Sequence, residues 1–530
     1  MCERGGPIVQ FYPIYRPDQI RAAEKPLLEK VGGQLMRHAA FAVAVEAAKL
    51  LPRACSRVLV LVGPGNNGGD ALFAAAELAR RGHRIILWST GDMHPEGIET
   101  LRRATVPRDV EDFLPEPLGQ WVDEPDTEPA DMDIPAQRQS RLNRAAKALR
   151  ESCDLVIDGL LGVGARPPLR APMARITAVL RLAYLPTVAV DIPTGVDPIT
   201  GEFDADGSIA ADVTVTFGGL KPAHVLAGRR CGKVVVKGLG IDTQLREDDT
   251  REWALLDPEA EGLRVEAPDM DTFSVRWPLP GPTSDKYNGG VVGVRAGSEK
   301  YPGAALLCVA GAVRATSPMV RYMGPNKQQV VDHFPAVVAG EGRVQAFVTG
   351  PGSGGDGLAE DVGRNVPLLL DADALTAIAQ DEELAARLRS RRAWTLLTPH
   401  AGEYERLMGH APAADRVAAA KEMAAKYNCA VLLKGKVTTI VGRPGFDQQV
   451  FHVVAPTSFA ATPGSGDVLA GAVGAVMATV RAPEPDEDDL SMCWAVANAA
   501  FAHALAAASY GAPCDALQIA EALPAVIAAG

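Results

Sequence analysis

The sequence has no C-x-x-C pair of cysteines and no long run of basic residues. Its eight cysteines are scattered over 530 residues, which disfavours a zinc site and predicts free thiols in a reducing cytosol. The net charge is −12, from 53 lysines and arginines against 65 acidic residues. A nucleic-acid partner is disfavoured, because phosphate backbones are bound by clustered lysine and arginine. An anionic ligand would have to be held by local backbone N–H groups.

Long apolar runs are also missing. No apolar segment follows the N-terminus, so we predict no signal peptide. The most apolar late stretch, Cys493–Ser509, contains Asn498 and His503 and is too short to cross a bilayer comfortably, so we interpret it as a buried helix. These absences predict a cytoplasmic protein with no membrane partner. We also expect a homo-oligomer.

What the chain does contain is an alternation of strand-length apolar runs with alanine-rich helical stretches such as Asp70–Arg81. Nearly continuous apolar strands are typical of parallel sheets buried on both faces, and strands that alternate with helices predict doubly wound α/β folds. The strand-like runs of the first half are Ser56–Gly63, His83–Ser89, Cys153–Leu160 and Pro186–Pro193. Those of the second half are Gly289–Ser298, Val344–Gly354, Val366–Leu375, Trp394–Glu403 and Cys429–Gly442.

Two charged stretches interrupt this alternation. Glu124–Arg141 is acidic, contains prolines and has no periodicity, so we predict a surface loop there. Leu245–Trp253 is charged with weak periodicity, and a chain of this length is expected to form two domains. We therefore place a boundary near Thr250, between domains of residues 1–245 and 250–530.

Polar residues follow several strands of the first half. The stretch GPGNNGGD, Gly63–Asp70, follows a strand and opens a helix, where backbone N–H groups and the helix dipole attract a phosphate; an ordinary Gly/Asn turn is the alternative. Asp158 and Thr194 follow two further strands. Ligands bind beyond the carboxyl ends of parallel strands, so Asn67, Asp158 and Thr194 are expected to converge as oxygen ligands of a hard cation. Separate cap or turn roles are the alternative.

The second half contains an acidic residue after a glycine-rich loop, in TPGSGDVLAGAV (Thr462–Val473). Asp467 is either a helix-capping carboxylate or a general base beside an anion hole formed by Gly464–Gly466. We favour the base, because a hydroxyl bound there would lose its proton while a phosphoryl group meets backbone N–H groups. His400 and Lys434 are expected at the same sheet edge. The alternatives are a cap or loop histidine for His400 and a solvated or snorkelling cation for Lys434.

The segments QLMRHA, GPGNNGGD, DGLLGVGARPP, DIPTGVD and ADVTVTFGGLKPAH occur in this order between about Tyr12 and Asp242. They resemble the NAD(P)H-hydrate epimerase domain, which implies a Rossmann-like fold, a dinucleotide ligand and a K⁺ ion at Asn67, Asp158 and Thr194. Ala71, Val163 and Thr194 depart from the usual Gly, Thr and Ser. The resemblance assigns the ligand to Asp191 and to Asn66, Asn67, Gly68, Gly69, Asp70, Gly162, Val163, Gly164, Ala165, Arg166, Pro167 and Pro168.

The segments TPHAGE, LKGKVT and PGSGD resemble the ADP/ATP-dependent NAD(P)H-hydrate dehydratase of the ribokinase-like superfamily, from about Trp277 onwards. Asp285 replaces the family's His, and Thr316–Pro318 replaces its usual glycines, which raises the alternatives of weaker activity or shifted substrate contacts. The resemblance assigns the nucleotide to Lys434, Gly435, Lys436, Val437, Thr438 and Gly466. It assigns the hydrated dinucleotide to Ala304, Gly352, His400 and Asp467.

Together, the two resemblances imply a bifunctional NAD(P)H-hydrate repair enzyme. It would epimerise R and S hydrates at C6 and dehydrate the S form with ADP, or alternatively ATP; with ADP the products are AMP and phosphate. Mg²⁺ is expected on the nucleotide, Asp467 as the base of dehydration, and Asp191 as the candidate acid/base of epimerisation. Two alternatives remain: a ribokinase-like small-molecule kinase, because its base and anion hole are shared across the superfamily, and a non-catalytic nucleotide-binding module in the first half.

Overall fold

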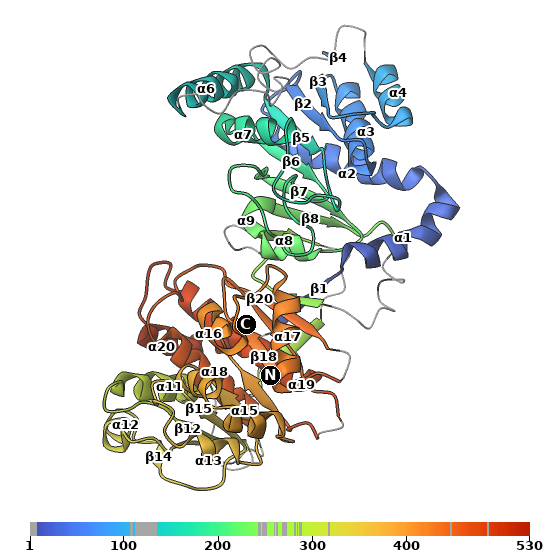
Figure 1. The fold of residues 1–530 in the computed structure, drawn as a ribbon. Coiled ribbons are helices and arrows are strands. Elements are labelled where there is room, and N and C mark those ends of the chain that lie inside the picture. Colours follow the sequence, from blue (N-terminus) through green and yellow to red (C-terminus); the bar gives the residue numbers. More distant parts are fainter. Residues whose placement is uncertain are drawn as a thin grey trace. The chain divides into compact units, whose positions relative to one another are not determined.

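The chain separates into two compact units (Figure 1). The first domain consists of Ile14–Asp248 and Pro258–Met270, and the second of Met1–Pro13, Asp249–Asp257 and Asp271–Gly530. The computed structural model describes residues 8–105, 110–111, 135–241, 245, 252–258, 260, 263–267, 273–279, 282, 285, 289–315, 319–445, 448–484 and 487–529. Thr250 and the departure at Thr316–Pro318 lie outside these described residues.

An eight-stranded sheet forms the centre of the first domain. Its strands are β2 (Arg57–Val62), β3 (Arg84–Ser89), β4 (Val110–Glu111), β5 (Leu155–Gly159), β6 (Thr187–Val190), β7 (Val213–Phe217), β8 (Lys233–Lys237) and β10 (Arg264–Glu266). They lie in the order β10-β8-β7-β6-β5-β2-β3-β4, and every pairing is parallel. The chain direction across the sheet reverses between β2 and β5, which is where doubly wound sheets open a ligand crevice.

Helices cover both faces of this sheet (Figure 1). They are α1 (Pro17–Val31), α2 (Gln34–Leu50), α3 (Asn66–Arg80), α4 (Pro95–Ala104), α6 (Pro135–Ser152), α7 (Met173–Ala183), α8 (Pro222–Leu226) and α9 (Gly228–Cys231). Alternate residues of β2 separate the two cores: Val60 packs with α2 and α3, whereas Leu59 packs with α6 and α7. The predicted doubly wound α/β fold is confirmed.

Two boundaries predicted in the first domain differ from the structure. The helix predicted over Asp70–Arg81 is present but begins four residues earlier, at Asn66, so the NNGGD residues belong to the start of α3. The loop predicted over Glu124–Arg141 is helical from Pro135 onwards, where α6 begins. Residues 124–134 lie outside the described part of the chain. Proline suits the first turn of a helix, and the Gln139–Asn143 hydrogen bond of 3.0 Å adds an i,i+4 contact.

A twelve-stranded sheet forms the centre of the second domain. Its strands are β1 (Ile8–Ile14), β9 (Glu252–Leu255), β11 (Phe273–Arg276), β12 (Val291–Arg295), β13 (Met319–Tyr322), β14 (Val338–Ala339), β15 (Ala346–Thr349), β16 (Leu368–Leu370), β17 (Thr395–Leu397), β18 (Ala430–Leu433), β19 (Val437–Val441) and β20 (Val450–Val454). The order is β11-β1-β9-β20-β19-β18-β17-β16-β15-β12-β13-β14. The part from β18 to β14 is parallel, whereas β19 is antiparallel to both of its neighbours.

Helices cover both faces of the second sheet as well. They are α11 (Pro302–Arg314), α12 (Lys327–His333), α13 (Leu358–Val362), α14 (Asp373–Gln380), α15 (Glu382–Arg389), α16 (Ala401–Met408), α17 (Arg416–Tyr427), α18 (Ser465–Thr479), α19 (Leu490–Ala508) and α20 (Ala516–Ala529). Of these, α19 is apolar and long enough to cross a membrane, but 78% of its apolar window is buried inside the protein. The prediction of a buried helix at Cys493–Ser509 is therefore confirmed.

Two short segments pair with the sheet of the other half of the sequence. β1 precedes the first domain but lies between β11 and β9 in the second sheet, where Phe11 packs on Trp494 with 4.5 Å between ring centroids. β10 follows the boundary region but pairs in parallel with β8 of the first sheet. The simple ranges 1–245 and 250–530 did not include these two exchanges.

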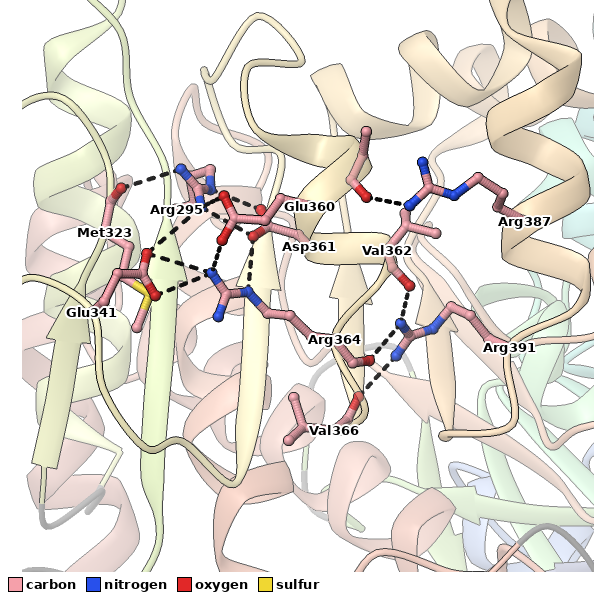
Figure 2. Close-up of polar contacts among 11 residues, drawn as sticks. Arg295, Met323, Glu341, Glu360, Asp361, Val362, Arg364, Val366, Arg387 and Arg391 are labelled. Atoms are coloured by element: carbon pink, nitrogen blue, oxygen red, sulfur yellow. Dashed lines mark hydrogen bonds and ion pairs between the residues drawn. The ribbon is translucent and has the colours of Figure 1, made fainter.

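A network of arginines and carboxylates anchors α13 to the second sheet (Figure 2). Asp361 is fully buried, and its carboxylate accepts hydrogen bonds from Arg295 Nε at 2.8 Å and Arg364 Nε at 3.1 Å. Arg391 donates to the carbonyl oxygens of Val362, Arg364 and Val366. Each partner compensates the desolvation of the others, so the network is stable only when it is complete.

We therefore expect Asp361→Ala to destabilise the second domain by about 3–5 kcal/mol, because two partly buried guanidinium groups lose their shared carboxylate. The measurement is chemical denaturation followed by circular dichroism. Glu360→Gln is the matched control, since the Glu360 side chain is 60% exposed and exposed ion pairs contribute about 0–1 kcal/mol. Equal losses for the two variants would contradict this account.

Candidate active sites

The first domain has a cavity of about 160 Å³ at the carboxyl edge of its sheet. Five residues predicted to bind ligand line it: Asn66, Asn67, Asp70, Val163 and Asp191. Helices α1 and α2 close the other side with mostly apolar side chains. The remaining lining residues are Pro17, Ile20, Arg21, Glu24, Leu28, Leu35, Met36, Ala39, Phe217, Lys221 and Leu239.

Asp191 is bonded to a buried lysine. Lys221, whose side chain is 2% exposed, places Nζ 2.7 Å from Asp191 Oδ1, and the Thr216 hydroxyl donates to the same oxygen at 2.9 Å. Burial alone would raise the pKa of Asp191, but the charge and hydrogen bond of Lys221 outweigh burial and lower it. His224 Nε2 lies 2.8 Å from the Asp191 carbonyl oxygen, and Asp191 adopts a φ of +67°, which is uncommon outside glycine. This carboxylate is held charged and in a defined position.

Asp70 is in the opposite state in the same cavity. Burial, with the neighbouring charges of Asp191 and Glu24, raises the pKa of Asp70 well above its usual value. Burial also raises the pKa of Glu24, although the charge of Lys221 opposes the rise. The cavity therefore contains one carboxylate that is stabilised in its charged form and a second carboxyl group that favours its neutral form.

Two of the three predicted cation ligands, Asp158 and Thr194, lie near the ends of β5 and β6, and the third, Asn67, lies in the first turn of α3 and lines this cavity. Asp158 is fully buried and accepts hydrogen bonds from the Thr194 hydroxyl at 2.7 Å and the Thr194 N–H at 2.8 Å. Burial raises the pKa of Asp158 to about 6, and among the described residues no cationic side chain lies within 4 Å of it. Asn67 donates Nδ2 to the Val190 carbonyl oxygen at 2.8 Å, which leaves its amide oxygen available. A buried carboxylate without a cationic partner, beside hydroxyl and amide oxygens, fits a monovalent cation.

The other residues assigned to the first ligand are not among those that line this cavity. A Cβ at Gly68 would lie 1.9 Å from the Gly63 carbonyl oxygen, so only glycine permits this approach of α3 to β2. Arg166 forms a 3.7 Å ion pair with Asp197. The remaining residues of this group are Gly69, Gly162, Gly164, Ala165, Pro167 and Pro168.

The second domain has a larger cavity, of about 570 Å³, at the carboxyl edge of its sheet. Six predicted ligand residues line it: His400, Lys434, Gly435, Lys436, Thr438 and Gly466. Most of the remaining wall is apolar or small. These residues are Val453, Ala455, Thr457, Ser458, Ala460, Ala461, Thr462, Ser465, Leu469, Ala500, His503 and Ala504.

Lys434 is an ion-paired lysine rather than a solvated cation. Its Nζ lies 2.7 Å from Asp371 Oδ1 and 3.6 Å from Glu403 Oε2. Burial alone would lower the pKa of Lys434, but the charges of Asp371 and Glu403 outweigh burial and raise it. A Cβ at Gly466 would lie 3.6 Å from Lys434 Nζ, so the ammonium group reaches the start of α18.

Asp467 lies in the first turn of α18 but does not cap it. The N-cap residue is Gly464, with a φ of +84°, and a Cβ there would lie 2.3 Å from Leu307 Cδ1. Burial, followed by the charge of Asp371, raises the pKa of Asp467 to about 7, although Lys434 opposes the rise. Among the described residues, the Asp467 carboxylate has no hydrogen-bond partner within the protein. A carboxylate with this pKa suits proton transfer near neutral pH.

His400 combines two roles. It caps α16, because its Nδ1 accepts from the Gly402 N–H at 3.0 Å while its own N–H donates to Glu403 Oε2 at 2.8 Å. Its ring also lines the cavity. The loop-or-cap interpretation thus describes how His400 is positioned, and ligand binding stays a prediction.

The remaining predicted residues of the second domain are not among those that line the cavity. Ala304 and Gly352 are neighbours at the switch point between β12 and β15, because a Cβ at Gly352 would lie 2.6 Å from Ala304 Cβ. Val437 is buried in β19, and Asp285 is exposed. Their ligand roles stay predictions.

Sequence reasoning did not assign a role to Lys221, Asp371 or Glu403. Lys221 lies in a segment noted only for its resemblance, GGLKPAH, and a lysine is rarely buried unless it is paired. Asp371 and Glu403 follow predicted strands, which was the available signal, but their convergence on Lys434 depends on tertiary distances.

The chain is similar over most of its length to known proteins. A sequence profile described as YjeF-related protein N-terminus matches residues 32–223, and one described as NAD(P)H-hydrate dehydratase matches residues 292–524. The bifunctional NAD(P)H-hydrate repair enzyme Nnr of Mycobacterium tuberculosis strain H37Rv is 40% identical, covering 88% of this chain and 89% of the relative. The enzyme of the same name from Corynebacterium glutamicum is 36% identical, covering 97% and 98%.

Among solved structures, the ADP/ATP-dependent NAD(P)H-hydrate dehydratase from Bacillus subtilis, co-crystallised with ATP and Mg²⁺, is 24% identical with a TM-score of 0.40, covering 47% of this chain and 92% of that one. The two profiles match one domain each, in the order found in the full-length relatives. The chain therefore belongs to the family of bifunctional NAD(P)H-hydrate repair enzymes.

Proposed function

We propose that the first domain interconverts the R and S hydrates of NADH and NADPH at C6, and that the second dehydrates the S form with ADP, releasing AMP and phosphate. The observation that carries the second assignment is the Asp467 carboxylate, whose pKa is raised to about 7 beside the glycine-rich start of α18. The family membership of both halves supports the pairing of the two activities.

Dehydration needs a better leaving group than hydroxide. In our proposal Asp467 removes the proton of the C6 hydroxyl. The hydroxyl oxygen attacks the terminal phosphorus of ADP at the same time, so AMP leaves and a phosphate ester forms at C6. The C6–O bond of the ester then breaks as C5 loses a proton, which restores the C5–C6 double bond and releases phosphate. Positioning and charge stabilisation are the main contributions, as in phosphoryl transfer generally.

The cavity wall suggests how the nucleotide lies. Val453, Leu469 and Ala500 form an apolar surface suited to a base, and Lys434–Thr438 and Gly466 surround the position for its phosphates. Lys434 would stabilise the charge that develops on the transferred phosphoryl group. Ala304, Gly352 and His400 would contact the hydrated dinucleotide.

Mg²⁺ is expected to accompany the nucleotide. Within the described residues, no group of three or more His, Cys, Asp or Glu side chains is arranged to hold a metal ion. This agrees with a metal held mainly by phosphate oxygens, with Asp371 as the nearest candidate carboxylate. When bound, Mg²⁺ would neutralise phosphate charge.

In the first domain, we assign the dinucleotide to the cavity lined by Asn66, Asn67, Asp70, Val163 and Asp191. Asp191 would act on the C6 centre through Oδ2, since Lys221 and Thr216 bond to Oδ1. K⁺ would be held by Asp158, Thr194 and Asn67, and when bound it would supply a positive charge beneath the ligand loop. A cytoplasmic location and a homo-oligomer complete the proposal.

The alternative function is a small-molecule kinase fused to a nucleotide-binding module, and family membership favours repair over it. Incubation with hydrated NADH and ADP separates the two. A repair enzyme restores the NADH absorbance band and forms AMP, whereas a kinase leaves the hydrate unchanged.

Asp467→Asn is expected to lower kcat for dehydration by about 10²–10⁴-fold, because the amide keeps the shape but cannot accept the hydroxyl proton. The assay follows recovery of NADH from the S hydrate, with ADP and ATP in parallel. Asp373→Asn is the control for a nearby half-buried carboxylate, whose Oδ2 accepts from the Gly354 N–H at 3.0 Å. Full activity of Asp467→Asn would refute the base.

The pH dependence follows from the raised pKa of Asp467. A base acts in its charged form, so kcat/KM for dehydration should rise with pH through about 7 and then level off. Asp467→Asn should abolish this rise. A rate that falls as pH rises through this range would show that a protonated group is required instead.

Potassium is expected to stabilise the first domain by binding beside Asp158. The experiment replaces choline chloride by KCl at equal ionic strength. We expect the midpoint of the first domain's thermal unfolding to rise by about 2–4 °C for each kcal/mol of stabilisation that K⁺ binding contributes. Asp158→Asn removes the negative charge and should abolish the rise. A potassium effect of the same size in this variant would place the ion elsewhere.

A further inference from the structure

The first-domain cavity contains a carboxyl oxygen without a partner. Asp70 Oδ1 is buried and has no hydrogen-bond partner within the described part of the protein. An unsatisfied buried polar atom costs about 1–3 kcal/mol, so native proteins keep one mainly where a ligand or function requires it. Asp70 lines the same cavity as Asp191 and is 7% exposed as a whole, so its carboxyl group borders the space that a bound ligand would occupy.

The charged groups that face Asp70 come from several elements. Glu24 and Arg21 project from α1, Asp191 follows β6, and Lys221 precedes α8. The cavity residues on α2 are not ionisable: Leu35, Met36 and Ala39. Lys221 bonds to Asp191 rather than to Asp70. The nearest negative charges therefore oppose ionisation of Asp70, and burial adds to this effect.

Epimerisation at C6 has a specific chemical need. C6 carries a hydroxyl group and is bonded to ring nitrogen N1, so the N1 lone pair can expel the hydroxyl as water once a proton reaches its oxygen. The resulting C6 is planar, and water can return to either face. The reaction thus requires an acid for the departing oxygen and a base for the incoming water.

We propose that Asp70 is the general acid of the epimerase reaction and Asp191 its partner base, an inference that rests on the epimerase function proposed above. The Asp70 proton passes to the leaving oxygen as the C6–O bond breaks and N1=C6 forms. Water then adds to the opposite face of C6, its proton passes to Asp191 Oδ2, and the electron pair returns to N1. The proton returns from Asp191 to Asp70 through solvent, because Lys221 favours the charged form of Asp191.

The first test uses the wild-type chain in oxygen-18 water without ADP, so that dehydration is idle. The R and S hydrates are separated by chromatography, and the oxygen-18 content of each is measured by mass spectrometry. We expect every epimerisation event to introduce one solvent oxygen at C6. Epimers that interconvert with their original oxygen would overturn the proposal, because they would require cleavage of N1–C6 instead.

The second test is Asp70→Asn, which keeps the shape but has no acidic proton. We expect kcat for epimerisation to fall by about 10²–10⁴-fold with KM changed by less than about threefold. Asp92→Asn is the matched control, since Asp92 is exposed. Glu24→Gln tests the rival acid, and a selective loss in this variant with Asp70→Asn unaffected would overturn the proposal.

The pH profile of the wild type needs no variant and so does not depend on the folding of Asp70→Asn. Asp70 acts while protonated, so kcat should fall about tenfold per pH unit above its raised pKa, and kcat in Asp70→Asn should lose this fall. A wild type that does not interconvert the epimers would refute the proposed function itself. Interconversion at full rate in Asp70→Asn would refute only the role of Asp70.

Discussion

A lysine bonded to one aspartate, buried in the first domain and half-buried in the second, is the interaction on which each candidate site depends. Lys221 and Asp191 form this pair in the first domain, and Lys434 and Asp371 form it in the second, both at 2.7 Å. Neither partner would remain charged alone in such a place, since desolvation costs several kcal/mol per ion. Once paired, the fixed negative charge acts on the next carboxyl group along the cavity wall. Burial is the larger cause of the raised pKa of Asp70 and of Asp467, and the charge of Asp191 or Asp371 adds to it.

The two sheets bring these groups together by the same geometry. The carboxyl ends of parallel strands lie at one edge of a sheet, and both sheets reverse strand order, between β2 and β5 in the first and between β12 and β15 in the second. The glycine-bearing starts of α3 and α18 lie at these edges, where backbone N–H groups face anionic ligands. The domains therefore share an electrostatic arrangement at the same sheet edge, although their strand orders differ.

The sequence predicted the fold class and most strands because nearly continuous apolar runs such as RVLVLV are unambiguous. It also predicted which polar residues reach the sheet edge, because these residues lie at strand ends. Asp158 lies near the end of β5, Asp191 and Lys434 directly follow β6 and β18, and His400 lies shortly after β17. It missed what depends on distance between remote segments: the burial of Lys221, the contact of Lys434 with Glu403, and the unpartnered oxygen of Asp70. It missed α6 before Arg141 because an acidic, proline-bearing stretch obscured the helix start at Pro135.

The position of β1 in the second sheet limits where the chain can be cut to separate the two domains. A polypeptide of residues 250–530 would lack the strand that joins β11 to β9, together with the Phe11 ring that packs on Trp494. Two strand edges would then be open to pairing with other molecules, the usual origin of aggregation in β proteins. Truncation between the two domains would therefore remove a strand from the second sheet as well as the first domain.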